Sequence, residues 1–229
     1  MESARQMRAR LAQRPVAPRE FREALLAVGP SERDAWVDSV LGLSEVAGDG
    51  ASLPRGCVPY LPCPVDALLR AVDVAEVGVD DVIVDVGSGL GRAAVLMQLL
   101  SGASAIGVEI QPDLAAASRR LAERVKGLRF TVVEGDAVEE RAALSDGSVF
   151  FLYCPFSGER LTRLLASLEA LAGARRLRVC CVDLPLPHCP WLEPVGPDGG
   201  ALAVYRSVTG IRRRGSSSRR ESPPRARRR

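Results

Sequence analysis

The stretch Val84-Asp85-Val86-Gly87-Ser88-Gly89-Leu90-Gly91 decides the fold of this chain. A short β-branched run over residues 82–86 predicts a strand, and helical spacing over about residues 90–100 predicts a helix directly after the glycines. In such a turn the glycines let the backbone approach a bound group closely, and the start of the helix offers N–H groups to it. The stretch therefore predicts a turn that binds a nucleotide-like group.

Downstream of this turn, short β-branched runs alternate with helical patterns, which indicates a parallel sheet built from βαβ units. Helices are expected at about residues 112–125 and 158–172, and strands at residues 105–109, 130–133, 149–153 and 178–182. Residues 191–195 and 201–208 flank a glycine-rich turn and predict an antiparallel hairpin. The expected fold class is α/β, with a doubly wound, mostly parallel seven-stranded sheet that ends in this hairpin.

The N-terminal part predicts a small helical cap over residues 1–54. One helix is expected at about residues 21–28, and a second is expected to begin with Ser31 as its N-cap, with Trp36, Val37, Val40 and Leu41 on one face. Residues 48–54 are turn-rich and predict a linker, and a further helix is expected at about residues 65–72. The main domain then spans residues 55–209, and residues 210–229 form an Arg-rich tail that is expected to be disordered.

Charge is distributed unevenly along the chain. The net charge is +3, but residues 212–229 hold nine arginines and one glutamate, which leaves about −5 for the rest. This tail could contact a polyanion, although it has no interleaved aromatic residues that would indicate a nucleic-acid substrate.

Six cysteines without a Cys-x-x-Cys pair, and a single histidine, predict reduced thiols and no metal site. The chain has no apolar run long enough for a membrane span and no signal peptide, so a cytoplasmic location is expected; an Arg-rich mitochondrial presequence is the alternative.

The glycine spacing discriminates between cofactors. A dinucleotide turn requires glycine at the first, third and sixth positions, but the sixth position from Gly87 is Arg92. A Gly-x-Gly-x-Gly turn that follows Asp85 suits a cofactor with a cationic amino-acid end and no pyrophosphate, which favours S-adenosylmethionine (SAM). Glu109, at the end of the next strand, could accept both ribose hydroxyls.

A second acid follows the third expected strand. Asp136 could accept from the adenine amine, and the backbone N–H of Ala137 could donate to a ring nitrogen. Because the carboxyl ends of parallel strands meet in one crevice, Asp85, Glu109 and Asp136 are expected to lie together. Each acid alone could simply cap the following helix, but the set at these offsets is typical of an adenosine site.

From Tyr60 to about Ala137 the chain resembles class I SAM-dependent methyltransferases. Their first motif is an acid before Gly-x-Gly-x-Gly, with an acid ending the second strand and Gly-Asp after the third. Residues 58–66, Val-Pro-Tyr-Leu-Pro-Cys-Pro-Val-Asp, resemble the non-SET histone-lysine methyltransferases and the mitochondrial enzymes that methylate the ATP synthase c subunit and the adenine nucleotide translocase. The resemblance implies that this segment covers the methionine end of SAM. Tyr60 and Cys63 take the places of Tyr and Thr in the family pattern Tyr-x-x-Thr-Pro, and cysteine lacks the strong hydrogen bonding of a hydroxyl.

Tyr153-Cys154-Pro155-Phe156 occupies the position at which many class I enzymes that methylate nitrogen carry Asn/Asp-Pro-Pro-Tyr/Phe. Tyr153 replaces the leading amide or acid. The resemblance implies that this replacement disfavours a planar adenine or glutamine amide as the target. Tyr153 and Phe156 could line a channel for a narrow amine, or Phe156 could be core. The order Cys154-Pro155 reverses the Pro-Cys of 5-methylcytosine enzymes, so a covalent intermediate is not expected.

Tyr153 and His188 are the candidates to help a lysine ammonium lose its proton, although His188 could equally be a solvated loop residue. The expected function is transfer of a methyl group from SAM to a nucleophile, with a protein lysine amine favoured as the acceptor. A small-molecule N- or O-methyltransferase and a non-catalytic SAM-binding module are the alternatives.

Overall fold

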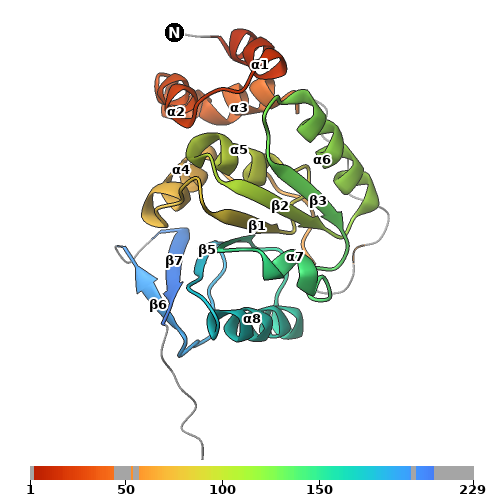
Figure 1. The fold of residues 1–229 in the computed structure, drawn as a ribbon, viewed down its shortest axis with the longest axis vertical. Helices are drawn as coiled ribbons and strands as arrows, with labels where there is room; N and C mark the ends of the chain where they lie inside the picture. The colour runs from red at the N-terminus through yellow and green to blue at the C-terminus, as the bar shows by residue number, and fades with distance from the viewer. Residues whose placement is uncertain (1–2, 44–52, 54–56, 197–199, 209–229) are drawn as a thin grey trace, which may run out of the picture.

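A seven-stranded sheet forms the centre of the protein in a computed structural model, which describes residues 3–43, 53, 57–196 and 200–208 (Figure 1). Its strand order is β3-β2-β1-β4-β5-β7-β6. The five parallel strands are β1 (Val82–Val86), β2 (Ser104–Glu109), β3 (Phe130–Glu134), β4 (Val149–Tyr153) and β5 (Arg178–Val182), and the antiparallel pair is β6 (Leu192–Val195) and β7 (Leu202–Ser207). The predicted fold class, including the terminal hairpin, is confirmed.

Helices cover both faces of the sheet, because alternate residues of the inner strands point to opposite sides. On β4, Val149 and Phe151 belong to one buried cluster, whereas Phe150 and Leu152 belong to the other. The first cluster packs against α4 (Val65–Val74) and α5 (Arg92–Ser101), and the second against α7 (Arg141–Ser145) and α8 (Gly158–Ala172). Helix α6 (Pro112–Arg124) lies beside β2 and β3.

The N-terminal helices form an outer layer on α5 and α4, as Figure 1 shows. They are α1 (Ala4–Gln13), α2 (Pro18–Leu26), the 3-10 turn η1 (Pro30–Glu32) and α3 (Arg33–Leu41). Phe21 and Trp36 pack with their ring centroids 5.9 Å apart, within the same buried cluster as α4 and α5. Helices α1, α2 and α3 therefore share one core with the sheet. The domain boundary at residue 54 stays a prediction.

Two features of this layer differ from the sequence-based expectation. Helix α1 was not predicted, because Met7 and Leu11 are its only buried residues and the other positions carry mostly polar side chains. Ser31 is not an N-cap: it lies inside η1, and Glu32 precedes α3 without a side-chain cap hydrogen bond. Pro30 initiates this extra turn because its fixed φ suits the first position of a helix.

Other differences concern element ends. Helix α5 begins at Arg92, two residues later than expected, because Gly91 adopts a left-handed φ of +79° as its N-cap. Helix α7 was missed because five residues show no clear periodicity. Of the expected linker at 48–54 only residue 53 is described, and the tail at 210–229 lies outside the described residues. Among the helices that the structure does describe, none has the length and apolar character needed to cross a membrane.

Candidate cofactor and acceptor site

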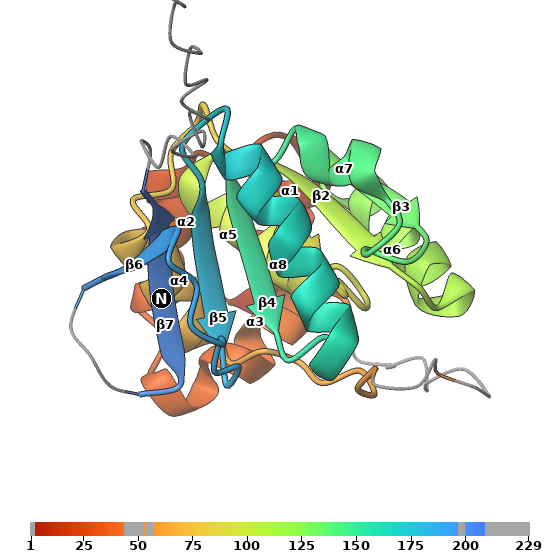
Figure 2. The same cartoon turned by 90° about the horizontal axis from the view of Figure 1, so that it is seen from below.

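A cavity of about 230 Å³ opens at the carboxyl ends of the parallel strands. Eleven of the thirteen predicted site residues line it: Tyr60, Cys63, Asp85, Gly87, Ser88, Gly89, Glu109, Asp136, Ala137, Tyr153 and Phe156. In Figure 2 the segment that precedes α4 runs past the ends of β4 and β5. The parallel topology therefore brings together residues that are up to 96 positions apart in the sequence.

The glycine turn is fastened to β2 by its own backbone. The N–H groups of Gly87 and Ser88 donate to the Val108 carbonyl at 2.9 and 3.1 Å, and that of Gly91 donates to the Ser88 carbonyl at 2.8 Å. These three N–H groups are therefore used within the protein itself. What the glycines provide is space, since a Cβ on Gly89, at φ +53°, would collide with the Tyr60 ring.

Gly91 does not line the cavity. Besides its left-handed φ, it packs against Ser118 and the ring of Phe130, both of which a Cβ at this position would meet. Its role in the structure is to start α5 and let that helix lie close to β3. The third glycine of the motif thus contributes to the shape of the turn without lining the cavity.

Asp85 is a buried carboxylate at the end of β1, with 3% of its surface exposed. Its Oδ2 accepts from the backbone N–H of Ala94 at 3.2 Å. Burial raises its pKa to about 7, the Ala94 hydrogen bond opposes that rise, and the nearby Glu109 charge adds to it. A cation placed beside Asp85 would relieve this unfavourable environment.

Glu109 closes the other side of the glycine turn. Its Oε2 accepts from the N–H of Gly89 and its Oε1 from the N–H of Gln111, each at 2.7 Å. Since a carboxylate oxygen can accept more than one hydrogen bond, both oxygens keep the capacity to accept a ribose hydroxyl. The same side chain therefore holds the turn and faces the cavity.

Asp136 has a partner that sequence reasoning missed. Its Oδ1 accepts from the N–H of Val138 at 3.0 Å and from Arg160 Nη2 on α8 at 2.6 Å. The Arg160 guanidinium also lies over the ring of Phe156, 5.3 Å from the ring centroid. Phe156 is buried, so it sits on the Asp136 side of the cavity as part of a wall, rather than as a free ring at the acceptor end.

The segment from Cys57 to Pro64 forms the outer wall. Cys57 and Phe156 form an isolated antiparallel β-bridge through their backbones, and the Val58 N–H donates to the Pro155 carbonyl at 3.3 Å. Burial raises the pKa of Tyr60 and that of Cys63 to about 12, so both side chains stay protonated at neutral pH. The Cys63 thiol points to the carbonyl of Pro64, at 3.9 Å.

Arg92 anchors this wall to the N-terminal layer, a contact that no sequence pattern predicted. The side chain is 3% exposed, and its Nη1 donates to the Cys63 carbonyl at 2.5 Å. Its Nε donates to Asp38 at 2.6 Å and its Nη2 to Asp34 at 2.9 Å, both on α3. The same Asp34 oxygen accepts from the N–H of Val65 at 3.1 Å. One guanidinium thus joins α5, α3 and the covering segment.

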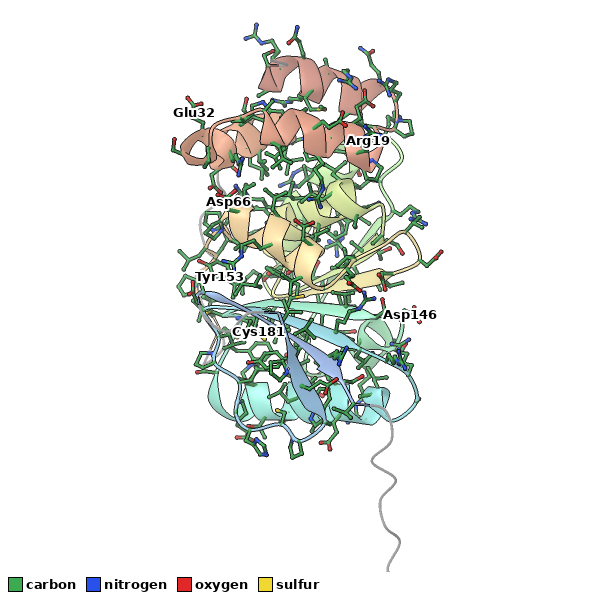
Figure 3. The ribbon with its side chains drawn as sticks, turned by 90° about the vertical axis from the view of Figure 1, so that its left-hand side faces the viewer. Arg19, Glu32, Asp66, Asp146, Tyr153 and Cys181 are labelled. Carbon is green, nitrogen blue, oxygen red and sulfur yellow. The ribbon has the colours of Figure 1, made fainter. Side chains whose placement is uncertain are left out.

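The opposite end of the cavity is built from the ends of β4 and β5. Tyr153 lies at the edge of the molecule in Figure 3 and lines the cavity together with Cys154 and Asp183. The Cys154 thiol donates to the Asp183 carbonyl at 2.8 Å, and burial raises its pKa, so it is a protonated donor. His188 is exposed on the loop after β5 and is not brought to the cavity.

A comparison of the sequence with protein-family models finds no match, and a comparison with curated proteins finds none either. Solved structures do match. An RNA methyltransferase from Salinibacter ruber in complex with S-adenosyl-L-homocysteine has 25% sequence identity and a TM-score of 0.51, over 64% of this chain and 92% of that one. A putative methyltransferase from Escherichia coli, yhhF, has 18% identity and a TM-score of 0.52, over 69% and 92%.

A mutant of MtNAS in complex with SAM also matches, with 17% identity and a TM-score of 0.50 over 64% of this chain and 62% of that one. The chain therefore has the Rossmann-like fold of class I SAM-dependent methyltransferases. The Salinibacter ruber enzyme, at 25% identity, supports a methyltransferase with SAM as its cofactor. The neighbours include an RNA methyltransferase, so they do not single out the protein-lysine groups that the sequence resembles.

Proposed function

We propose that this chain is a SAM-dependent protein methyltransferase whose acceptor is a lysine amine. One observation carries the proposal: the cofactor-side carboxylates lie together in a cavity whose open rim carries exposed apolar side chains beside Tyr153. On that rim Val58 and Leu61 expose 41% and 57% of their surface, beside Tyr153. Exposed aliphatic side chains at the entrance of a site suit contact with a folded or extended protein.

The acids of the cavity fit the cofactor. Asp85 and Glu109, which are buried, would hold the cationic amino-acid end and the ribose hydroxyls, and the partly exposed Asp136 with the Ala137 N–H would hold the adenine edge. When bound, SAM supplies a methyl group on a positively charged sulfur, which is an excellent leaving group. The protein then has to align and desolvate the acceptor rather than activate it extensively.

The acceptor end favours an amine over a planar amide. Tyr153 stands where an Asn or Asp would grip a planar target, and its hydroxyl stays protonated because burial raises its pKa. A lysine ammonium must lose a proton before transfer. Since His188 lies outside the cavity, we assign that proton to solvent at the open rim rather than to a histidine.

Transfer of labelled methyl groups tests the proposal. The full chain is incubated with methyl-labelled SAM and a fractionated cell lysate, with Glu109→Ala as the matched inactive control. The expected result is label in protein that is recovered as methyllysine after acid hydrolysis. Label in RNA, as the Salinibacter ruber neighbour would suggest, or in small molecules contradicts the lysine assignment. Absence of any label favours a non-catalytic SAM-binding module.

The remaining assignments are part of the same proposal. The enzyme would act in the cytoplasm, and its Arg-rich tail at residues 210–229 would contact a polyanion through salt-sensitive interactions. A mobility assay with a polyanion such as heparin, comparing the full chain with a chain ending at residue 209, tests the tail separately from methyl transfer.

A further inference from the structure

The cavity contains four acidic side chains, and one of them is unlike the others. Asp85 and Glu109 accept hydrogen bonds from backbone N–H groups, and Asp136 accepts from Val138 and Arg160. Within the part of the chain that the structure describes, the Asp183 carboxylate has no such bond and no ion pair. This is notable in a chain with thirty arginines, which pair with acids at many places on its surface.

Asp183 is held at the rim by its backbone rather than by its side chain. Its N–H donates to the Ala201 carbonyl at 2.8 Å, and its carbonyl accepts from the Cys154 thiol at 2.8 Å. Both Cys154 and Asp183 adopt left-handed φ values, +43° and +50°. Such a backbone costs about 1–2 kcal/mol for a residue with a Cβ, and residues that keep it cluster at functional sites.

The carboxylate also acts on the groups around it. Its negative charge contributes to raising the pKa of Tyr153, of Cys154 and of Cys63, after the larger effect of burial. All three residues line the cavity. Asp183 is therefore within electrostatic reach of the place that an acceptor group must occupy.

We propose that Asp183 is a specificity-determining residue that recognises the cationic amine of the acceptor at the mouth of the cavity. The apolar rim of Val58 and Leu61 would hold the aliphatic part of the acceptor, and Tyr153 would flank its end. Because Asp183 is exposed, the ammonium can bind there and still release its proton to water before it moves inward. This inference rests on the proposed function, in which the acceptor is an amine. Asp183 supplies the negative charge that selects an amine over a neutral nucleophile.

Sinefungin provides a test that needs no known acceptor. It is the SAM analogue in which a carbon bearing an amine replaces the methylsulfonium, so it carries a cation toward the acceptor end. S-adenosylhomocysteine lacks that cation. The ratio of their dissociation constants, measured by titration calorimetry, reports the electrostatic preference of the acceptor end with the adenosine contacts cancelled.

The full chain is compared with Asp183→Asn, Asp183→Glu and the control Asp146→Asn. Asp146 is also exposed but lies at the other end of β4 from Tyr153 (Figure 3). The expected result is that Asp183→Asn weakens sinefungin about three- to tenfold relative to S-adenosylhomocysteine, while Asp183→Glu restores most of the preference. Asp146→Asn leaves the ratio unchanged.

Each other outcome is decisive. An unchanged ratio in Asp183→Asn, with normal binding of S-adenosylhomocysteine, overturns the role of Asp183 and leaves the proposed function standing. An equal loss in Asp146→Asn shows a general charge effect and also overturns it. If the unaltered chain binds neither compound, the proposed cofactor site itself fails. Thermal unfolding of each variant confirms that Asp183→Asn is folded when its ratio is measured.

Discussion

Protonation of Asp85 is expected to control cofactor affinity near neutral pH. Burial raises its pKa to about 7, so the side chain is half protonated at that pH in the ligand-free protein. A cationic ligand beside it favours the carboxylate form and must displace the proton. Binding of SAM is therefore expected to strengthen as the pH rises through 7 and to release a proton below it.

The size of the effect follows from the titration. If only the carboxylate form binds, about one molecule in eleven is competent at pH 6 and about ten in eleven at pH 8, so affinity changes about tenfold. Folding shows the opposite trend. Because the folded pKa is raised above the ordinary value of 3.8, Asp85 contributes stability at low pH that is lost as the pH rises from about 4 to about 7. The loss is ~4 kcal/mol by this relation.

Titration calorimetry at pH 6, 7 and 8, in buffers of different ionisation enthalpy, measures both the affinity and the protons released. Asp85→Asn is the matched control, since an amide oxygen can still accept from Ala94. The variant should bind SAM weakly, lose the component of the pH dependence that Asp85 causes, and gain stability at pH 8. The reasoning is refuted if the pH dependence of the variant equals that of the unaltered chain.

Three further predictions concern the cavity wall. Glu109→Gln should reduce the rise in melting temperature produced by S-adenosylhomocysteine by well over half, because the charged hydrogen-bond acceptor is lost. NAD should produce no rise in either protein. A rise with NAD alone would contradict the SAM site. Gly89→Ala should lower the free energy of unfolding, measured by denaturant titration, by about 1–2 kcal/mol and should weaken SAM binding, because its Cβ meets the Tyr60 ring. Gly78→Ala is the control: this glycine has open space around it, so the substitution should change neither quantity. Arg92→Met should lower the free energy of unfolding by about 3 kcal/mol, because the substitution leaves Asp34, Asp38 and the Cys63 carbonyl without this partner. It should also weaken SAM binding, although Arg92 has no predicted contact with the cofactor. Loss of stability with unchanged affinity would limit Arg92 to a structural role.

The cofactor side of the cavity was largely predictable from the sequence because its signals are local. The acids at positions 85, 109 and 136 each follow a short β-branched strand, and parallel topology brings strand ends together. The glycine spacing also identified the type of turn. What the spacing did not reveal was that most of the N–H groups of the turn are used by β2 and Ser88.

The parts that could not be predicted depend on long-range partners. Arg92 contacts residues 54 and 58 positions earlier, and Arg160 pairs with an acid 24 positions earlier, with no periodicity to mark either. Asp183 follows its strand as other acids do, and the role we propose for it depends on its carboxylate having no partner among the described residues, which only a structure can show. His188 was suggested by chemistry alone, and its loop leads away from the cavity.

The guanidinium of Arg92 makes the N-terminal layer part of the energetics of cofactor binding. Helix α3 and residues 57–64, which form the outer wall of the cavity, share this one group, so docking of the helix and the position of this segment are thermodynamically linked. By reciprocity, a ligand that stabilises this segment is expected to slow the exchange of amide hydrogens in α3. The outer layer of helices is thereby coupled to the cavity although no residue of α1–α3 lines it.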